Sequence, residues 1–199
     1  MHERVSKDVI YFPHTFLSGF YTSSVLPMEH ITEMESEFIV AYDRYADAIF
    51  RFCIIRTRDR DVARDIMQET FAHAWEHVAS GKSIDRMRPF LYRIASNLVI
   101  DRARKHRTLS LDALMEDEHF TPPSADKGNP QDAAMIAEML RAVDQLDEKY
   151  RTPIILRYVE GMDVGDIAAV VGESENVVSV HLHRGIEKLR ELLDAQLLP

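Results

Sequence analysis

The residue types between Arg88 and Arg107, in the run RPFLYRIASNLVIDRARKHR, suit binding to a polyanion. Residues 82–107 carry 8 basic and 2 acidic side chains, although the whole chain has a net charge of −9. Arginine suits phosphates, while asparagine and aromatic side chains can hydrogen-bond to or stack on unpaired bases. The run therefore predicts local binding to nucleic acid, with a preference for an unpaired strand over an intact duplex.

Helical periodicity predicts how this run is displayed. Apolar residues such as Ile94 and Leu98 recur at the spacing of one helix face and are expected to point inward. The residues expected on the outer face are Arg93, Asn97, Asp101 and Arg104, flanked by Arg102, Lys105 and Arg107. Cations near a helix C-terminus also complement the helix dipole, so this simpler explanation of residues 104–107 stays open.

A second helix is expected over residues 60–79, with an acidic outer face. The expected buried stripe is Val62, Ile66, Thr70, Phe71, Ala74, Trp75 and Val78. The opposite face carries Asp65, Gln68, Glu69, Ala72 and Glu76, without partners at i+4. By spacing alone this face is either a site for a protein partner or an ordinary solvated surface.

Residues 163–192 are expected to form helix, glycine turn and helix, the arrangement of a helix-turn-helix. Asp163 and Ser174 are expected to cap the two helices, and Gly172 to turn the chain between them. On the second helix Ser174, Val177, His181, Arg184 and Lys188 recur on the outer face, which would enter a major groove. A plain helical hairpin is the alternative.

The whole chain is expected to be all-α, with two small helical domains joined by a flexible acidic linker. The expected parts are an N-terminal extension of unknown role over 1–33, a helical domain over 34–107, a linker over 108–131 and a second domain over 132–199. The expected helix boundaries are a capping box at Thr32 and Glu35, a break before Asp59, an end at Gly81, Pro89 in a first turn, and turns at Gly161 and Gly165. Pro153 is expected to cause a slight kink.

Several classes of function are not favoured. The single cysteine, Cys53, lies in an apolar run and is expected to be a buried small hydrophobe. His73 with His77, and His181 with His183, lack further ligands at suitable spacing, so no metal site is expected. Neither a membrane span nor a signal peptide is expected, which predicts a cytoplasmic protein. We expect no cofactor, no catalytic activity and no small-molecule substrate, because the sequence shows no glycine-rich phosphate loop, no nucleophile motif and no paired catalytic carboxylates.

Three motifs occur in a fixed order: DVARDIMQETFAHAW over 61–75, the basic run over 88–107, and LDEKYRTPIILRYVEGMDVGDIAAVVGESENVVSVHLHRGIEKLR over 146–190. Together they resemble the extracytoplasmic-function group of bacterial RNA polymerase sigma factors. The resemblance covers about two thirds of the chain, roughly residues 36–107 and 133–193. It implies a promoter-specificity subunit with region 2-like and region 4-like domains, which binds core polymerase, recognises the minus-ten and minus-thirty-five elements and supports DNA melting.

The resemblance also implies roles for residues at matching positions. The implied contacts to the clamp of the largest polymerase subunit are Asp65, Gln68, Glu69, Phe71, Ala72, Trp75 and Glu76. The implied contacts to the minus-ten element are Arg88, Phe90, Tyr92, Arg93, Asn97, Asp101, Arg102, Arg104 and Lys105. The implied contacts to the minus-thirty-five element are Ser174, Asn176, Val177, Ser179, Val180, His181, His183, Arg184 and Lys188. Further implied partners are the flap of the second largest subunit and an anti-sigma factor, which in this family is often bound to the membrane.

The chain departs from the family in its last helix. Residues 176–181 read Asn-Val-Val-Ser-Val-His where members often carry Gly-Thr-Val-Lys-Ser-Arg, so two basic positions are lost. Weaker phosphate anchoring is therefore expected, with Val177 and Val180 meeting thymine methyl groups instead. The alternative function is a helix-turn-helix repressor or activator that binds DNA alone, which would not need the acidic face of 65–76.

Overall fold

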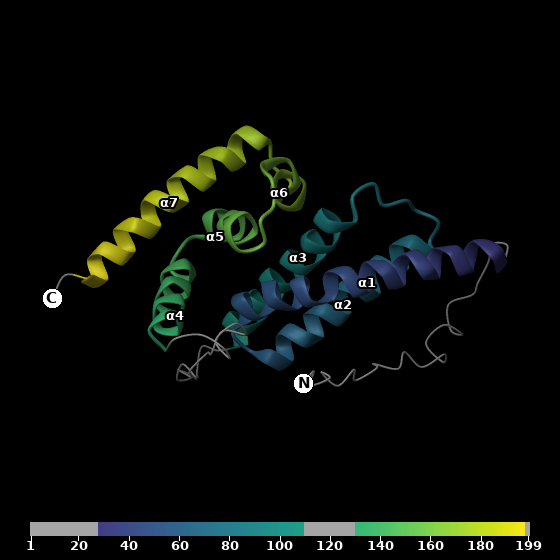
Figure 1. Cartoon of the computed structure of the whole chain (residues 1–199), viewed down its shortest axis with the longest axis horizontal. Helices are drawn as coiled ribbons and strands as arrows, with labels where there is room; N and C mark the ends of the chain where they lie inside the picture. The colour runs from purple at the N-terminus through teal and green to yellow at the C-terminus, as the bar shows by residue number, and fades with distance from the viewer. Residues whose placement is uncertain (1–27, 110–129, 198–199) are drawn as a thin grey trace, which may run out of the picture. The chain divides into compact units, whose positions relative to one another are not determined.

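The computed structural model describes the backbone of residues 28–109 and 130–197, and these residues form helices without any strand (Figure 1). The helices are α1 (Met28–Thr57), α2 (Arg60–Ala79), α3 (Met87–Leu109), α4 (Pro130–Asp144), α5 (Glu148–Ile154), α6 (Val164–Val171) and α7 (Glu175–Leu197). A π-helical turn over Ile155–Val159 follows α5. The all-α class predicted from the sequence is confirmed.

Helix boundaries follow capping chemistry that the sequence displays. Asp59 precedes α2, and its carboxylate accepts hydrogen bonds from the backbone N–H groups of residues 61 and 62, both at 2.9 Å. Asp163 likewise accepts from the N–H of Asp166 at 2.7 Å and starts α6. Gly172 ends α6 in the left-handed conformation at φ 74°, which glycine adopts without a steric penalty. The predicted caps at these positions are confirmed.

Two expected boundaries differ in the structure. Helix α1 begins at Met28, so Thr32 lies inside the helix and does not cap it. Gly165 lies in the first turn of α6 and not in a connection. Pro153 lies within α5, and the α-helical pattern gives way to the π turn two residues later. The slight kink expected at Pro153 stays a prediction.

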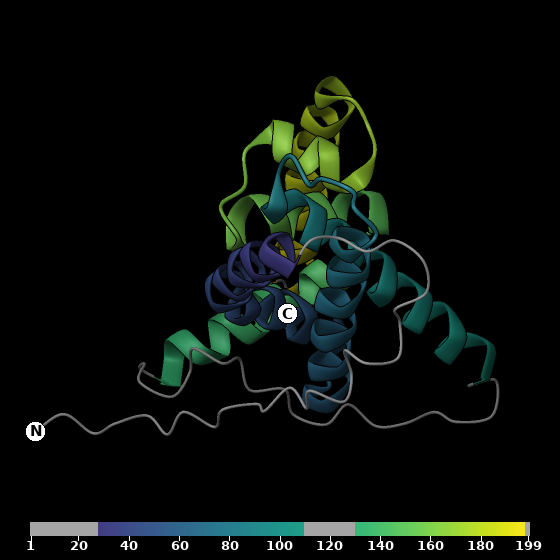
Figure 2. The ribbon, with the colours of Figure 1, turned by 90° about the vertical axis from the view of Figure 1, so that its right-hand side faces the viewer.

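The buried residues of α1, α2 and α3 form one layer of the core. Phe52, Phe71 and Leu91 each have at most 1% of their surface exposed. The α2 and α3 helices pack against each other, as the two views in Figures 1 and 2 agree. Cys53 is fully buried among them, as predicted from its apolar neighbours.

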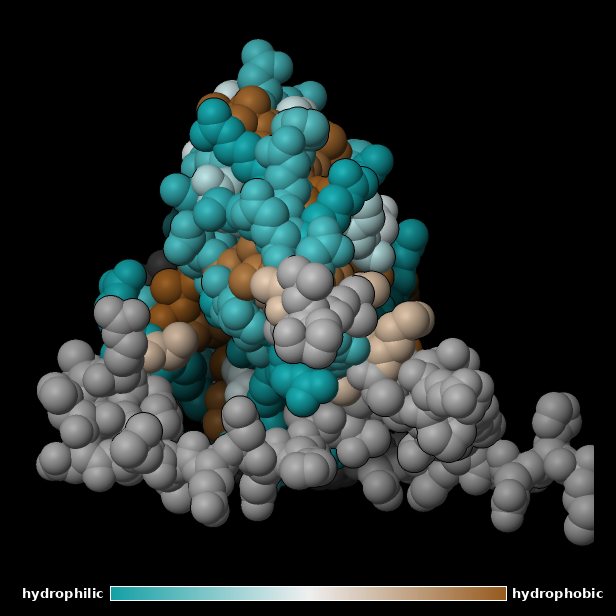
Figure 3. All heavy atoms as spheres, turned by 90° about the vertical axis from the view of Figure 1, so that its left-hand side faces the viewer, coloured by the Kyte–Doolittle hydropathy of each residue, from teal (hydrophilic) through white to brown (hydrophobic). Residues whose placement is uncertain are grey.

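The helix-turn-helix packs through a close approach of α7 to α5. Gly185 lies on the buried side of α7, where an added Cβ would come 2.6 Å from Cδ1 of Ile154. A side chain at this position would therefore force the two helices apart. Leu182 and Val178, one and two turns earlier, complete the buried side of α7. Among the coloured residues in Figure 3 hydrophilic ones predominate, and hydrophobic ones appear in smaller patches.

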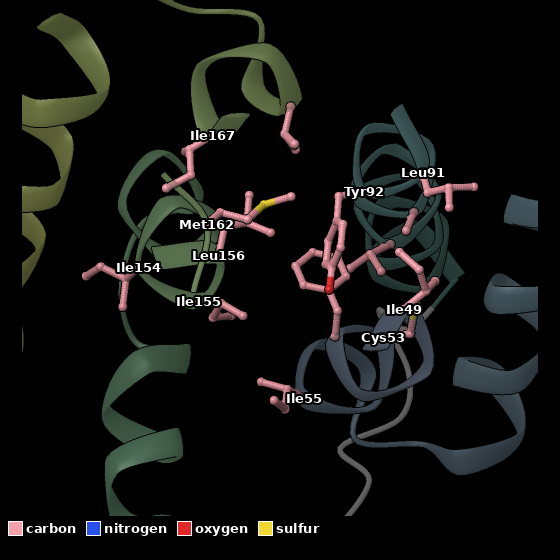
Figure 4. Packing of buried hydrophobic residues seen from close by; sticks show 14 of the residues in the cluster. Ile49, Cys53, Ile55, Leu91, Tyr92, Ile154, Ile155, Leu156, Met162 and Ile167 are labelled. Atoms are coloured by element: carbon pink, nitrogen blue, oxygen red, sulfur yellow. The ribbon is translucent and has the colours of Figure 1, made fainter. Parts of the chain in front are cut away.

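By its internal contacts the chain divides into two units, Met1–Ser36 and Glu37–Pro199. Within the second unit the buried residues of α1–α3 and of α5–α7 belong to one continuous cluster (Figure 4). The division into a 34–107 domain and a 132–199 domain stays a prediction. Most of the predicted extension 1–33 and of the predicted linker 108–131 lies outside the described residues.

Candidate nucleic-acid interface

The outer face of α2 carries the residues predicted to meet a protein partner. Asp65, Gln68, Ala72 and Glu76 are exposed along this face. Trp75 is half-buried, with its ring 5.2 Å from that of Phe38 on α1. The face therefore offers two acids and an amide to solvent, beside a partly covered indole.

Phe71, which the resemblance implied as a polymerase contact, lies in the buried stripe where helical periodicity predicted it. Its side chain is 1% exposed, and its ring lies 4.7 Å from that of Tyr42. In this structure Phe71 therefore supports the acidic face from the core and is not a surface contact.

Glu69 links the α2 face to α3. Its Oε2 lies 3.1 Å from Nη2 of Arg102, 33 residues further along the chain. Both side chains are partly exposed, at 38% and 40%, so the pair adds little to stability. The pair nevertheless brings a residue predicted to bind polymerase next to one predicted to bind DNA. The sequence pattern could not identify this partner, because it lies on another helix.

The outer face of α3 carries exposed polar residues at helical spacing. Arg93, Asn97, Asp101, Arg104 and Lys105 are all exposed. Asp101 lies 4.0 Å from the guanidinium of Arg104, which orients that cation along the helix. An exposed asparagine among arginines can hydrogen-bond to a base while its neighbours contact phosphates.

The two aromatic residues that the resemblance implies as contacts to the minus-ten element, Phe90 and Tyr92, are not exposed on α3. Phe90 is half-buried, with its ring 4.8 Å from the imidazole of His77 on α2. Tyr92 is fully buried and packs edge-on against Phe52 at 5.4 Å. In this arrangement neither aromatic side chain is splayed out toward solvent.

Tyr92 donates its hydroxyl hydrogen bond to Oε2 of Glu160 at 2.5 Å. Burial and the neighbouring carboxylate raise the pKa of the Tyr92 phenol well above its usual value. Arg88, also predicted to contact DNA, donates to the backbone carbonyl of Glu160. Sequence reasoning missed Glu160 and its second partner Arg51, because their positions 109 residues apart give no periodic signal.

The outer face of α7 displays most of the predicted duplex-reading residues. Those that are exposed are Ser174, Asn176, Val177, Ser179, Val180, His183, Arg184 and Lys188. Val177 and Val180 are 40% and 46% exposed, which is unusual for β-branched apolar side chains on a helix that also buries an apolar stripe. The ammonium of Lys188 lies 5.6 Å from the centre of the Tyr150 ring.

His181 turns partly away from this face. Its Nδ1 lies 3.0 Å from Oε2 of Glu173, a distance for an ionic contact, although the geometry is not that of a directed hydrogen bond. Its ring meets that of Tyr150 edge-on at 5.6 Å. His181 therefore joins α7 to α5 and to the turn before α7, in addition to any role at the surface.

The described residues contain no group of three or more histidine, cysteine or acidic side chains that could hold a metal ion. Within the same residues no helix is both long and apolar enough to cross a bilayer.

Comparison with known proteins agrees with the order of these surfaces. The family model for Sigma-70 region 2 matches residues 41–108, and the model for Sigma-70 region 4 matches residues 136–189. The chain is 34% identical over 160 residues to the ECF RNA polymerase sigma factor SigW of Bacillus subtilis, covering 76% of this chain and 86% of that protein. It is 30% identical over 154 residues to the ECF sigma factor SigL of Mycobacterium tuberculosis, covering 75% and 84%.

Two solved structures share the fold. One is the sigma factor RpoE in complex with the anti-sigma factor NepR from Bartonella quintana, with a TM-score of 0.62 at 22% identity, covering 81% of this chain and 97% of that chain. The other is CnrH in complex with the cytosolic domain of CnrY, with a TM-score of 0.61 at 25% identity, covering 81% and 90%.

Proposed function

Because this chain belongs to the extracytoplasmic-function sigma factors of bacterial RNA polymerase, we propose that it binds core polymerase, recognises two promoter elements and supports DNA melting. The observation that carries the proposal is the juxtaposition of α2 and α3. An exposed acidic face and an exposed basic face lie on two packed helices and meet at the Glu69–Arg102 pair. One rigid unit can therefore touch a basic protein surface and a DNA strand at the same time.

The acidic face of α2 is proposed to bind the clamp of the largest polymerase subunit. Asp65, Glu69 and Glu76 provide charge, and the half-buried ring of Trp75 provides an apolar anchor. Aromatic anchors surrounded by charged residues are typical of energetic centres in protein interfaces. Phe71 contributes by holding α2 against α1, and its removal would disturb the face from below.

The exposed face of α3 is proposed to read the minus-ten element on a single strand. Arg93 and Arg104 suit the phosphates of that strand, and the exposed amide of Asn97, between them on the helix, suits a hydrogen bond to a base. Single-strand binding by basic side chains, with added base contacts, would help to hold a melted duplex open.

The outer face of α7 is proposed to enter the major groove at the minus-thirty-five element. Arg184 and Lys188 are the basic side chains available to bind phosphate or a guanine edge. Val177 and Val180 are exposed at i and i+3, so both can meet thymine methyl groups on one wall of the groove. The flap of the second largest subunit would support this domain, as implied by the family.

An anti-sigma factor is proposed as the third partner. The structural relative RpoE is described in complex with the anti-sigma factor NepR, and CnrH is described in complex with the cytosolic domain of CnrY. The same fold in this chain supports a partner of that kind, bound to the membrane or free.

Co-elution of the purified full chain with core polymerase in size-exclusion chromatography tests the polymerase contact. We expect a stable complex that forms without DNA. The alternative, a repressor or activator that acts alone, predicts tight and salt-resistant binding of the isolated chain to promoter duplex and no co-elution. The net charge of −9 argues against such independent binding.

A further inference from the structure

Helices α1 and α3 are joined to the segment 144–166 by charged side chains with a consistent polarity. In each of the following pairs the cation comes from α1, from the connection after it or from the residue before α3, and the anion comes from the later segment. The pairs are Arg51–Glu160 at 3.1 Å, Arg56–Glu148 at 2.6 Å, Arg86–Asp166 at 2.8 Å, and Arg58–Asp144. The later segment thus presents negative charge to a row of arginines from the earlier part of the chain.

Glu160 is the centre of this contact. Its side chain is 1% exposed and accepts hydrogen bonds from Nε and Nη2 of Arg51, at 3.2 and 3.1 Å, and from the Tyr92 hydroxyl at 2.5 Å. Its backbone carbonyl accepts from Arg88. For two of these three donors, Arg88 and Tyr92, the family resemblance implies contacts to the minus-ten element. In this arrangement both are occupied by a residue of the same chain.

The π turn places Glu160 where it can make these contacts. The N–H of Glu160 donates to the carbonyl of Ile155 at 3.1 Å, a spacing of five residues in place of four. The wider turn leaves Tyr158 and Val159 exposed, at 61% and 44%, while Glu160 is buried. In Figure 4 Met162, which follows Glu160 closely, points toward Tyr92 across the contact, and both side chains are fully buried.

The contact between the two segments also carries a desolvation cost at Arg56. The Arg56 side chain is 3% exposed, and its Nε and Nη1 have no hydrogen-bond partner among the described residues. Buried guanidinium nitrogens without partners lose their hydration, so breaking this contact would return them to water. The attraction between the two segments is therefore partly offset, as expected for a contact that has to open during function.

We propose that Glu160 is an intramolecular latch, which holds α3 closed against the 144–166 segment and competes with promoter DNA for Arg88 and Tyr92. Opening the latch frees Arg88 and lets Tyr92 leave the core, so the chain binds a single strand weakly until polymerase separates the segments. This inference rests on the proposed function, because it assigns a regulation to the same minus-ten surface.

Spin labels on the full chain measure the latch without polymerase or DNA. Cysteines introduced at Asp43 on α1 and Glu191 on α7, both exposed, take the labels, while native Cys53 is fully buried. Pulsed electron–electron double resonance should give one main distance between the two labels when the chain carries no other substitution. Glu160→Ala should add a longer, broader population, whereas Asp61→Ala, which removes the same charge at an exposed site, should not.

A charge exchange guards against a variant that simply fails to fold. Arg86→Glu and Asp166→Lys each break the Arg86–Asp166 pair near the surface and should each add the longer distance, while the double variant should regain the single distance. Circular dichroism should report the same helix content for all of them. An unchanged distance distribution in Glu160→Ala and in both single charge variants would overturn the latch.

Fluorescence anisotropy with a short, labelled single-stranded oligonucleotide of mixed sequence tests the masking. Glu160→Ala should bind the strand about threefold to tenfold more tightly than the otherwise unchanged chain, the range expected from releasing one or two hydrogen-bonded contacts. Asp61→Ala measures how much the loss of one negative charge, by itself, changes the affinity for the strand. Equal binding by the two variants would overturn the masking, whereas failure of the chain to join polymerase would overturn the proposed function and leave the distance result standing.

Discussion

Oε2 of Glu69 on α2 lies 3.1 Å from Nη2 of Arg102 on α3, and this pair connects the surface proposed for polymerase to the surface proposed for DNA. Each side chain keeps more than a third of its surface exposed, so each can also reach a partner. Exchange of Arg102 between Glu69 and a phosphate would couple polymerase binding to strand binding.

Glu69→Lys should abolish binding to core polymerase while the fold is kept. The change reverses the charge at the centre of the acidic face and also repels Arg102. The free energy of unfolding should change by no more than about 1 kcal/mol, because the pair is exposed. Pull-down of core polymerase measures the binding, and thermal unfolding measures the fold. Asp43→Lys, an equal charge reversal at an exposed position of α1, is the control, and undiminished pull-down by Glu69→Lys would refute the assignment.

Arg184→Ala should weaken binding of the holoenzyme to minus-thirty-five duplex by about 1–3 kcal/mol if the guanidinium contacts a base. Arg190→Ala serves as the control, because Arg190 is also exposed on α7 but lies outside the proposed reading face. Titration of labelled promoter duplex measures both variants. A loss of equal size in the two would mean that general charge, and not a base contact, is responsible.

Thymine methyl groups should contribute to recognition by Val177 and Val180. Deoxyuridine in place of thymidine in the minus-thirty-five duplex removes only the methyl group, and each contacted position should cost about 0.8 kcal/mol, the value of one buried methylene. The double variant Val177→Ala, Val180→Ala should bind the two duplexes equally. If the unsubstituted chain already binds them equally, the valines read no methyl group.

The Cys53 thiol should be unreactive in the folded chain. Burial raises its pKa to about 12, so the folded state holds the thiol proton more tightly than the unfolded state does. The associated stability is fully present below the unfolded-state pKa of about 8.5 and is lost as the pH rises toward 12, by at most about 1.4 kcal/mol per pH unit. Urea unfolding at several alkaline pH values should therefore show a steeper loss for the natural chain than for Cys53→Ala. Rapid reaction of the native thiol with Ellman's reagent near neutral pH would contradict its burial.

Local features of this fold could be predicted from the sequence, and long-range ones could not. The caps at Asp59 and Asp163 and the left-handed Gly172 depend on neighbours within three or four residues, so residue type and spacing sufficed. Tyr92 looked like a surface aromatic, but a buried carboxylate 68 residues away accepts its hydrogen bond. Gly185 gave no signal either, because its requirement for a small residue comes from Ile154 on another helix.

In the candidate site, too, the sequence predicted local features and missed those that depend on distant residues. Helical periodicity identified the exposed rows of α2, α3 and α7, since solvent exposure on a helix repeats with the turn. Periodicity also placed Phe71 in the buried stripe, where it holds α2 to α1, although the family resemblance implied a surface contact. It placed His181 on the outer face of α7, whereas its ring turns toward Glu173. Assigning those roles requires the positions of α1 and of the turn before α7.

Transcription of genomic DNA by purified core polymerase, with and without the full chain, followed by mapping of the 5′ ends, measures promoter choice directly. A sigma factor of this kind should create a set of new start sites that share two spaced sequence elements, and Arg184→Ala should reduce their use while leaving background initiation unchanged. Identical start sites with and without the chain would contradict the account.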